Sequence, residues 1–581
     1  MKAVRILLCW LASSAAFIAA EAPKKTSPPD VFLVTIDTLR ADHVHCYGYE
    51  LIQTPTLDSL AKDGVRFTQA FTPSPITNTS HTSILTGLLP SSHGVTDFAV
   101  PLAPSHLTLA ELLKQKGYHT AAFIGSVILD SKTLAPGLDR GFDFYDNFPA
   151  HPQTKSRWGR VERRGMEVVQ HAETWMTAHP AGPHFVWVHL YDPHDPYEPP
   201  PPYSQIYKDR LYDGEIAYAD AALANFVAYL KRGGRYQSAL IVVVGDHGEG
   251  LGEHHEDTHG IFLYDSTTHV PLIVKLPAKT AAQGTAGQGT AGKVVKAQVR
   301  TTDILPTVTD LVQIPPPAQL DGESLKPYLD SSENRDRIAI GETDYPLRFG
   351  WAPLSSVRAE GFKFIEAPRP ELYDLHTDPK ELANHYEPAN PLAQKFNGML
   401  VELRAKTTTA ASASQSAQLP DPKDKIEEQN LLHAAMMASD DNRTDDARVA
   451  LEKVLRLDPR SPTALRQLGE LELHSEEYVR AAEHLRLARE VRPEDSTAAF
   501  YEGQARQKTG DLAGARDALE ASLKLTPGQF PARLLLGQVY LGLKDPKNAD
   551  DQFEAALLLE PKSAEAQAGL TQAQQMEKAG R

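Results

Sequence analysis

Three segments that lie far apart in the chain carry the side chains most suited to chemistry. The first is the stretch Pro75–Gly94, which opens with the polar, turn-prone run Thr77–Ser80 and continues as an expected helix, His81–Thr86. A hydroxyl just ahead of a helix lies beside free backbone N–H groups and the positive end of the helix dipole. Thr77 is therefore well placed to attack an anionic ester. The alternative is that Thr77 or Thr79 merely caps the helix.

The other two segments are apolar runs of strand length that end in a carboxylate. Val31–Ile36 is followed by Asp37, and Ala239–Gly245 is followed by Asp246 and His247 in a glycine-rich loop. The carboxyl ends of strands in an α/β sheet are where ligands bind. Aspartate and histidine supply oxygen and nitrogen ligands for a divalent metal. One such aspartate is often only a cap, but two of them with a histidine favour a metal site.

These segments resemble the sulfatase-type branch of the alkaline phosphatase superfamily, and the resemblance covers about residues 31–400 in family order. It implies an α/β fold in which helices sandwich a mixed sheet, with a small C-terminal α+β subdomain. The further matching stretches are TPTLDSLAKDGVRFTQAF (Thr54–Phe71), HLYDPHDPYEPP (His189–Pro200), GDHGEGLGEHHEDTHG (Gly245–Gly260), TTDILPTVTDLVQI (Thr301–Ile314) and ELYDLHTDPKELANH (Glu371–His385).

The resemblance implies a metal-dependent ester hydrolase or transferase with Thr77 as its nucleophile. Asp37, Thr77, Asp246 and His247 would hold one divalent ion. Thr38 stands where calcium-binding sulfatases have a second aspartate, and this favours Zn²⁺, with Mn²⁺ or Ca²⁺ as alternatives.

The same resemblance assigns roles to further polar residues. His194 and His259 are expected to be catalytic, by binding the anion or protonating the leaving group, or to hold a second metal together with Asp192. A weaker candidate is Lys275. Substrate-binding roles are expected for Asn78, His81 and His189.

The chain departs from the sulfatase pattern at the nucleophile. Sulfatases carry a Cys or Ser that is oxidised to an aldehyde, with Pro two and Arg four positions on, whereas this chain has Thr77, Thr79 and His81. Oxidation of a threonine would give a ketone, so phosphoesters are the expected substrates, and diesters above all, because no Arg or Lys cluster is visible near Thr77. The substrate would be a small anionic ester or an ester-bearing glycan or lipid. The alternatives are a sulfatase without the modified residue and a non-catalytic exported scaffold that acts through its repeats.

Residues 1–22 have the pattern of a signal peptide, which predicts an exported protein, periplasmic or secreted. Lys2 and Arg5 form the charged start, Ile6–Ala20 is apolar, and Ala20–Ala22 is an A-x-A-like cleavage site. The formal net charge of −16 argues against nucleic acid as a partner.

The 581 residues predict more than one domain. We expect a catalytic core at 31–330, its C-terminal subdomain at 331–405, a polar linker at 406–426 and tetratricopeptide repeats at 427–575. The repeats follow from a period of 34 residues, the tetratricopeptide length, at which proline, alanine and glycine recur. The recurring residues are Pro459, Pro493, Pro527 and Pro561; Ala447, Ala481, Ala515 and Ala549; and Gly469, Gly503 and Gly537. Such an array predicts a protein or peptide partner.

Overall fold

The structure is a computed structural model that describes residues 28–149, 156–278, 290–407 and 419–579. The predicted signal peptide at residues 1–22 lies outside these ranges. Within them, no helix has both the length and the apolar character that crossing a membrane requires.

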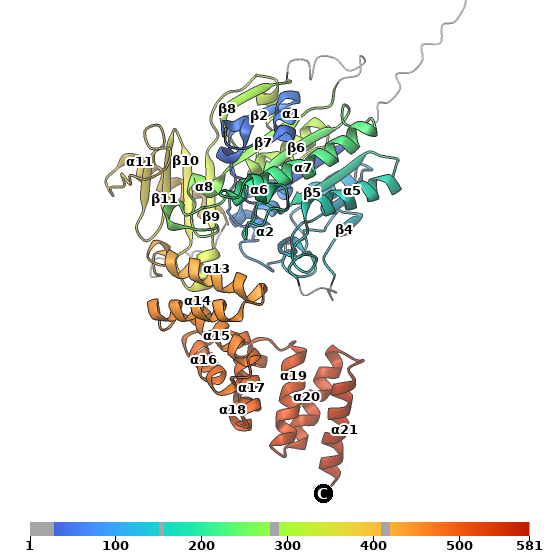
Figure 1. Cartoon of the computed structure of the whole chain (residues 1–581), viewed down its shortest axis with the longest axis vertical. Helices are drawn as coiled ribbons and strands as arrows, with labels where there is room; N and C mark the ends of the chain where they lie inside the picture. The colour runs from blue at the N-terminus through green and yellow to red at the C-terminus, as the bar shows by residue number, and fades with distance from the viewer. Residues whose placement is uncertain (1–27, 150–155, 279–289, 408–418, 580–581) are drawn as a thin grey trace, which may run out of the picture.

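An eight-stranded mixed sheet forms the centre of the larger part of the molecule (Figure 1), with the strand order β4-β3-β5-β1-β6-β7-β2-β8. β7 runs antiparallel to both of its neighbours, and the other pairs are parallel. Every residue of β1, β5 and β6 is buried, as the long apolar runs of a doubly covered sheet require. The strands are β1 Val31–Ile36, β2 Val65–Phe71, β3 His119–Phe123, β4 Phe144–Asp146, β5 His184–Leu190, β6 Leu240–Gly245, β7 His269–Lys275 and β8 Lys293–Arg300.

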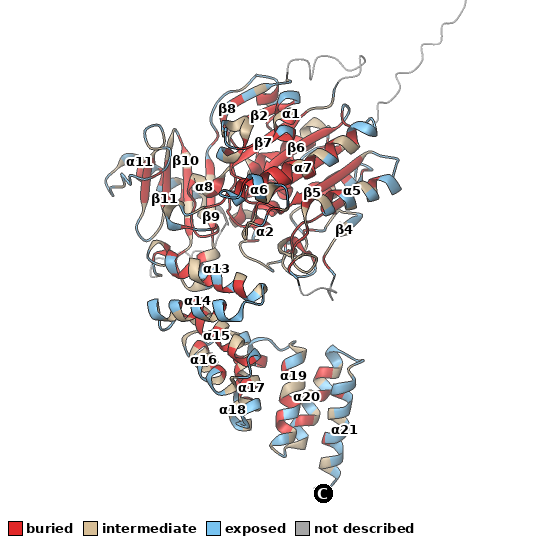
Figure 2. Cartoon of the chain, in the orientation of Figure 1, coloured by how far each residue is buried: buried red, intermediate tan, exposed pale blue. Residues whose placement is uncertain are grey.

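Helices cover both faces of this sheet, so the predicted α/β sandwich is confirmed. One apolar core joins the sheet to α2, α4, α9 and α10, and a second joins its other face to α1, α5 and α7. Figure 2 shows the sheet as the most deeply buried region of the chain. The helices are α1 Pro55–Asp63, α2 Thr77–Thr86, α3 Pro90–His93, α4 Leu109–Lys114, α5 Gly165–Ala178, α6 Tyr203–Ile206, α7 Leu211–Arg232, α8 Asp265–Thr268, α9 Ile304–Leu311 and α10 Lys326–Leu329.

A small antiparallel sheet forms the expected C-terminal α+β subdomain. Its strands follow the order β12-β11-β10-β9, and α11 (Pro391–Thr407) packs Phe396 and Leu400 against one of its faces. The strands are β9 Ala339–Thr343, β10 Leu354–Ala359, β11 Phe362–Glu366 and β12 Glu371–Asp374.

The C-terminal third of the chain is an array of paired helices (Figure 1), as the period predicted. The recurring glycines lie where two helices touch: a Cβ built on Gly469 or Gly503 would come within 2.5 Å of the Leu485 or Leu519 side chain of the next helix. The helices are α13 Ile426–Asp440, α14 Thr444–Leu457, α15 Pro462–His474, α16 Tyr478–Val491, α17 Ser496–Thr509, α18 Leu512–Leu525, α19 Phe530–Gly542, α20 Pro546–Leu559 and α21 Ala564–Ala579.

The first repeat helix packs against the subdomain. Residues 408–418 of the predicted linker lie outside the described ranges, but residues 419–426 are folded onto the protein. Lys423 forms an ion pair with Glu371 at 2.7 Å, and Ile426 shares an apolar core with Trp351 and Leu354. This end of the predicted linker is therefore part of the packed structure, because its charges and its isoleucine find partners there.

Candidate active site

Two parallel neighbouring strands bring the acidic residues together. β1 and β6 are in register, with Ile36 opposite Gly245, so that Asp37 and Asp246 leave the sheet side by side. The backbone N–H groups of Thr38 and His247 donate to Asp246 Oδ1 at 3.2 and 2.8 Å. Asp246 Oδ1 is thus fully engaged, whereas Oδ2 has no hydrogen-bond partner.

The nucleophile candidate lies at the start of α2, which begins at Thr77 and so earlier than the sequence predicted. No side chain caps this helix, which excludes the capping role for Thr77 and Thr79. The first N–H groups of a helix have no acceptor within the helix, so those of Thr77 and Asn78 are open to an anion. Ser80 Oγ donates to the backbone oxygen of Asp246 at 2.7 Å and thereby fixes the helix to the end of β6.

Four ligand atoms from these segments converge at one point. His247 Nδ1 donates to the Gly248 carbonyl at 2.9 Å, so its Nε2 carries a lone pair. This Nε2 lies 3.2 Å from Thr77 Oγ1, 3.6 Å from Asp37 Oδ1 and 3.5 Å from Asp246 Oδ2. Both carboxylate oxygens are buried without a hydrogen-bond partner. Such a group of ligand atoms is suited to a cation.

The pKa shifts are those expected of such a site without its ion. Burial raises the pKa of Asp37 and of Asp246 well above the ordinary value, and the negative charges of Glu249 and Asp37, respectively, add to the effect. Burial lowers the pKa of His247 well below its ordinary value and keeps the ring neutral, as a metal ligand must be. A bound cation would offset the cost of ionising the two carboxyl groups.

The geometry fits a small divalent ion. Zinc bonds of about 2.0–2.2 Å place tetrahedral ligands about 3.3–3.6 Å apart. The distances from His247 Nε2 to the other three atoms span 3.2–3.6 Å. The structure therefore brings together the predicted ligands Asp37, Thr77, Asp246 and His247.

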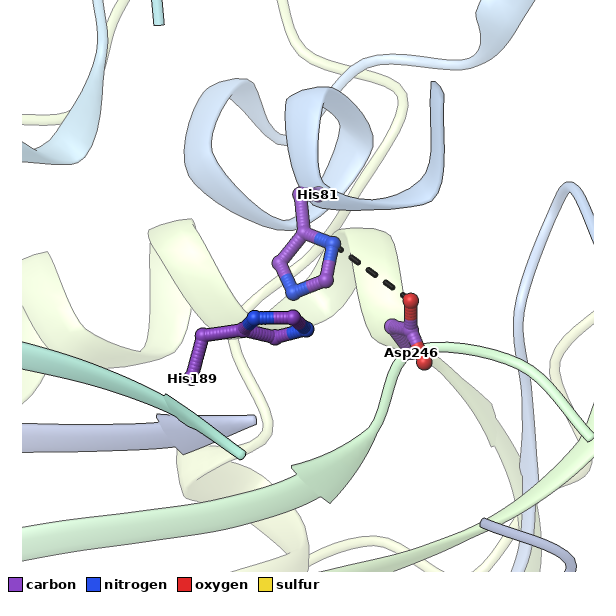
Figure 3. Close-up of side chains that lie close together, drawn as sticks. All are labelled: His81, His189 and Asp246. Carbon is purple, nitrogen blue, oxygen red and sulfur yellow. Dashed lines mark ion pairs between the residues drawn. The ribbon is translucent and has the colours of Figure 1, made fainter. Parts of the chain in front are cut away.

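His81 and His189 lie close to Asp246 (Figure 3), and His81 Nδ1 is 3.4 Å from Asp246 Oδ2. His81 donates from Nδ1 to the Thr77 carbonyl at 2.7 Å, and its Nε2 contacts Thr35 Oγ1 at 2.9 Å. His189 Nδ1 accepts from the Gly125 N–H at 3.2 Å, and its Nε2 donates to Asp37 Oδ2 at 3.1 Å. Both rings are fully buried and use both nitrogens. They orient Thr77 and Asp37, and this corrects the expectation that they bind substrate.

A cavity of about 570 Å³ opens over Thr77. His194 and His259 line it with their ring centres 5.0 Å apart, and the His259 ring lies 4.4 Å from that of His247. His194 Nδ1 donates to the Asp195 carbonyl at 2.6 Å and His259 Nδ1 donates to Glu249 Oε1 at 3.0 Å, so both rings keep Nε2 for a substrate. Burial lowers the pKa of each histidine to about 3.

Three predicted site residues have side chains that contact other groups. Asp192 accepts from the Gly165 N–H at 3.1 Å and caps α5, so it does not form a second metal site with His194 and His259. Asn78 donates from its amide to the Asp97 carbonyl at 2.9 Å and does not line the cavity. Lys275 contacts the carbonyls of Gln237 and Ala239, before β6 begins and hence at the opposite end of the sheet.

Three further residues at the site escaped the sequence-based prediction. Glu249 belongs to the Asp246 loop and orients His259, a role that its place beside the metal motif could have suggested. Glu162 lines the cavity, and burial raises its pKa to about 7. His433 comes from α13, with its Nε2 2.9 Å from Asp195 Oδ2. No sequence signal connects His433 to the site, because only the docking of the repeats brings it there.

Comparisons with known proteins agree with this fold. The Sulfatase family profile matches residues 29–314, and the N-sulphoglucosamine sulphohydrolase C-terminal profile matches residues 252–406. Tetratricopeptide repeat profiles match residues 434–496, 480–530 and 530–563.

The matches to individual relatives cover most of each relative's length and about two thirds of this chain. An arylsulfatase from Clostridium perfringens is 24% identical over 61% of this chain and 90% of its own. The crystal structure of the phosphonate monoester hydrolase of Agrobacterium radiobacter, 23% identical, superimposes with a TM-score of 0.55 over 65% of this chain and 96% of its own. A structure in complex with its substrate D-glucosamine-2-N,6-O-disulfate is 19% identical, with a TM-score of 0.56 over 66% of this chain and 98% of its own.

The chain is a sulfatase-type member of the alkaline phosphatase superfamily that carries a C-terminal tetratricopeptide array. As a member of the sulfatase family it is a hydrolase, and its buried aspartates and histidine form a site suited to a divalent metal.

Proposed function

We propose that this hydrolase cleaves phosphoesters, and diesters above all, through Thr77 with Zn²⁺ as its metal. One observation carries the proposal: two buried carboxylate oxygens without partners, Asp37 Oδ1 and Asp246 Oδ2, face the lone pair of His247 beside the Thr77 hydroxyl. When bound, a divalent ion supplies Lewis-acid stabilisation of the nucleophile and of the charge on the transferred group.

In the first step, Thr77 Oγ1, whose hydroxyl proton has passed to solvent, forms a bond to phosphorus while the bond to the leaving alcohol breaks. The open N–H groups at the start of α2 hydrogen-bond the non-bridging oxygens. His259 gives the leaving oxygen a proton from Nε2, because Glu249 fixes the other nitrogen as a donor at 3.0 Å. A bound anion favours the protonated ring, since a nearby negative charge raises the pKa of a histidine.

In the second step, water or an alcohol attacks the phosphorus of the phosphothreonine and releases Thr77. His259, now neutral, accepts the proton of the attacking group, so one residue acts first as acid and then as base. His194 presents its own Nε2 to the anion, because its Nδ1 donates to the Asp195 carbonyl at 2.6 Å. The two steps thus use Thr77, His194 and His259 of the cavity, with Glu249 behind His259.

The preference for phosphorus follows from the chemistry of threonine. An aldehyde hydrate has a second hydroxyl that can expel a sulfate by elimination, whereas Thr77 has none. The intermediate must be cleared by attack at the central atom, a route well suited to phosphoryl groups. Glu162 is also part of the cavity wall, and it disfavours a dianionic monoester more than a monoanionic diester. The substrate class therefore extends to phosphodiesters of small alcohols, glycans or lipids and to phosphonate monoesters, which are monoanions too.

Matched aryl esters test the proposal. We measure kcat/KM for 4-nitrophenyl sulfate, 4-nitrophenyl phosphate, bis(4-nitrophenyl) phosphate and a 4-nitrophenyl phosphonate with Zn²⁺, Mn²⁺ and Ca²⁺ in turn. The expected order places the diester and the phosphonate first and the sulfate last, and Thr77→Ala should abolish all turnover. Faster sulfate turnover that also disappears in Thr77→Ala would instead establish a sulfatase that works without the modified residue.

A further inference from the structure

The repeats form one wall of the cavity over Thr77. The cavity-lining residues of α13 recur at the spacing of a single helix face, so this whole face is turned to the cavity. α15 and the residue after α16 continue the wall. The repeat residues concerned are Gln429, Leu432, His433, Met436, Met437, Asp440, Thr463, Arg466, Gln467 and Arg492.

Specific polar contacts hold this wall to the catalytic domain. His433 Nε2 lies 2.9 Å from Asp195 Oδ2, next to His194 in sequence, and Asp440 pairs with Arg160 at 3.0 Å. Asn430 donates from Nδ2 to the His255 carbonyl at 2.9 Å. With the apolar core around Ile426, these contacts fix α13 along its length. The repeat wall is therefore held in a fixed position over the site.

The position of the cavity decides what can occupy it. The ester group must lie against Thr77 Oγ1, so its leaving alcohol extends into the space beyond. Leu432, Met436 and Met437 of α13 give this space an apolar lining, to which the catalytic domain adds Phe349. Methionine adapts its shape to varied apolar groups. α13 contacts the catalytic domain beside His194, through His433 and Asp195, so the part of the leaving group nearest the ester meets this apolar lining.

Polar side chains line the rest of the cavity, and some of their groups have no partner. Gln429 is 4% exposed, and its Oε1 has no hydrogen-bond partner. Among the cavity arginines, Arg348 pairs with Asp97 and Arg466 pairs with Asp495, each at 3.3 Å. For the Arg492 guanidinium, the described part of the chain supplies no ion pair. Because Arg492 follows α16 in the second repeat, this uncompensated cation lies on the wall farther along the array than α13.

The geometry points to a leaving-group subsite shared by the catalytic domain and the repeats, which takes an alcohol that is apolar next to the ester and carries an anionic group farther out. The ester at Thr77, the methionine-lined space and the unpaired Arg492 each match one part of such a substrate. This inference rests on the proposed function, since it assumes that the reacting group binds at Thr77. It gives the repeats a role in choosing the substrate.

Two aryl phosphodiesters that differ only at the far end of the leaving group test the subsite. Both are methyl phosphodiesters, one of 4-phenylphenol and one of 4'-hydroxybiphenyl-4-carboxylic acid, and both are assayed with the full-length, zinc-loaded chain. We expect kcat/KM to favour the carboxylate by about tenfold or more, the scale of a charge-assisted hydrogen bond. In Arg492→Gln the ratio of the two values should fall to about one.

Arg486→Gln is the matched control, because Arg486 lies on α16, pairs with Glu490 and does not line the cavity. It should keep the wild-type ratio. Met436→Ala should lower kcat/KM for both biphenyl esters relative to methyl 4-nitrophenyl phosphate. An equal kcat/KM for the two biphenyl esters in the wild type, or a ratio that Arg492→Gln leaves unchanged, overturns the subsite.

Calorimetry of both biphenyl esters with the zinc-loaded Thr77→Ala chain separates this inference from the proposed function. Tighter binding of the carboxylate, lost in the Thr77→Ala, Arg492→Gln double variant, supports the subsite even if the wild type hydrolyses neither ester. That combination would refute the proposed phosphodiesterase activity alone. Turnover of both esters without any preference in kcat/KM or in binding would refute the subsite alone.

Discussion

Asp246→Asn is the sharpest perturbation of the metal centre, because it removes a charge and keeps the shape of the side chain. The amide oxygen can still accept from the backbone of Thr38 and His247, as Oδ1 does at 3.2 and 2.8 Å. The atom that changes is Oδ2, which has no partner in the protein. The fold should therefore survive, and the effect should fall on the metal.

The expected loss of zinc affinity is large. Removing one partner of a buried charge pair costs about 3–5 kcal/mol, which corresponds to about a hundredfold or more in the dissociation constant. At a zinc concentration 100 times the wild-type constant, binding stabilises the wild type by about 2.7 kcal/mol, but the variant by only about 0.4 kcal/mol or less. Scanning calorimetry with and without zinc measures both values, and metal analysis gives the stoichiometry.

Without metal the order of stability should reverse. Because the folded-state pKa of Asp246 is raised, the contribution of this carboxyl to the stability of the metal-free wild type is complete only below the unfolded-state pKa of about 3.9. This contribution is lost as the pH rises through the raised pKa of the folded state. Asp246→Asn has no such group, so at neutral pH its metal-free form should be the more stable one. Asp209→Asn, an exposed control, should match the wild type. If Asp246→Asn binds zinc as tightly as the wild type, the proposed centre is wrong.

Three further predictions concern the histidines, the cavity wall and the repeats. His259→Ala should lower kcat by about 10²–10⁴-fold at unchanged zinc content. Glu249→Gln should lower kcat less and should shift the pH profile of kcat. Unchanged turnover in His259→Ala would remove His259 from the mechanism. Burial raises the pKa of Glu162 to about 7, so KM for a monoanionic diester should increase as the pH rises past this value and Glu162 becomes charged, whereas Glu162→Gln should show a flat KM. In the repeats, Gly503→Ala brings a Cβ within 2.5 Å of Leu519 Cγ and should destabilise the array by about 1–3 kcal/mol in circular-dichroism melts, whereas Gly528→Ala, with nothing within 4 Å, should not.

The sequence predicts that Asp37 and Asp246 come together, because both residues follow strand ends. Asp37 and Asp246 each terminate a buried apolar run, and the parallel register of β1 and β6 brings such residues together. The start of α2 was predicted too late, since hydroxyl residues have weak helix propensity, yet the burial of every residue from Thr77 to Thr86 overrides it.

Residues in irregular loops and between domains resist prediction from sequence. The proline-rich loop after β5 carries Asp192, His194 and Asp195, and no periodicity tells which side chain enters the cavity and which caps α5. The repeats are evident from their period, but their docking is not. His433 reaches the active site only through tertiary contacts such as its bond to Asp195 at 2.9 Å.

Trapping the covalent intermediate tests the central claim most directly. The zinc-loaded chain is mixed with bis(4-nitrophenyl) phosphate, quenched in acid during turnover, digested and analysed by tandem mass spectrometry. We predict a 4-nitrophenyl phosphoryl group on Thr77, absent when Thr77→Ala is treated in the same way. Turnover with the group on Thr79 or Ser80, or with no modified peptide under conditions that preserve a phosphothreonine, would contradict the assignment of Thr77 as the nucleophile.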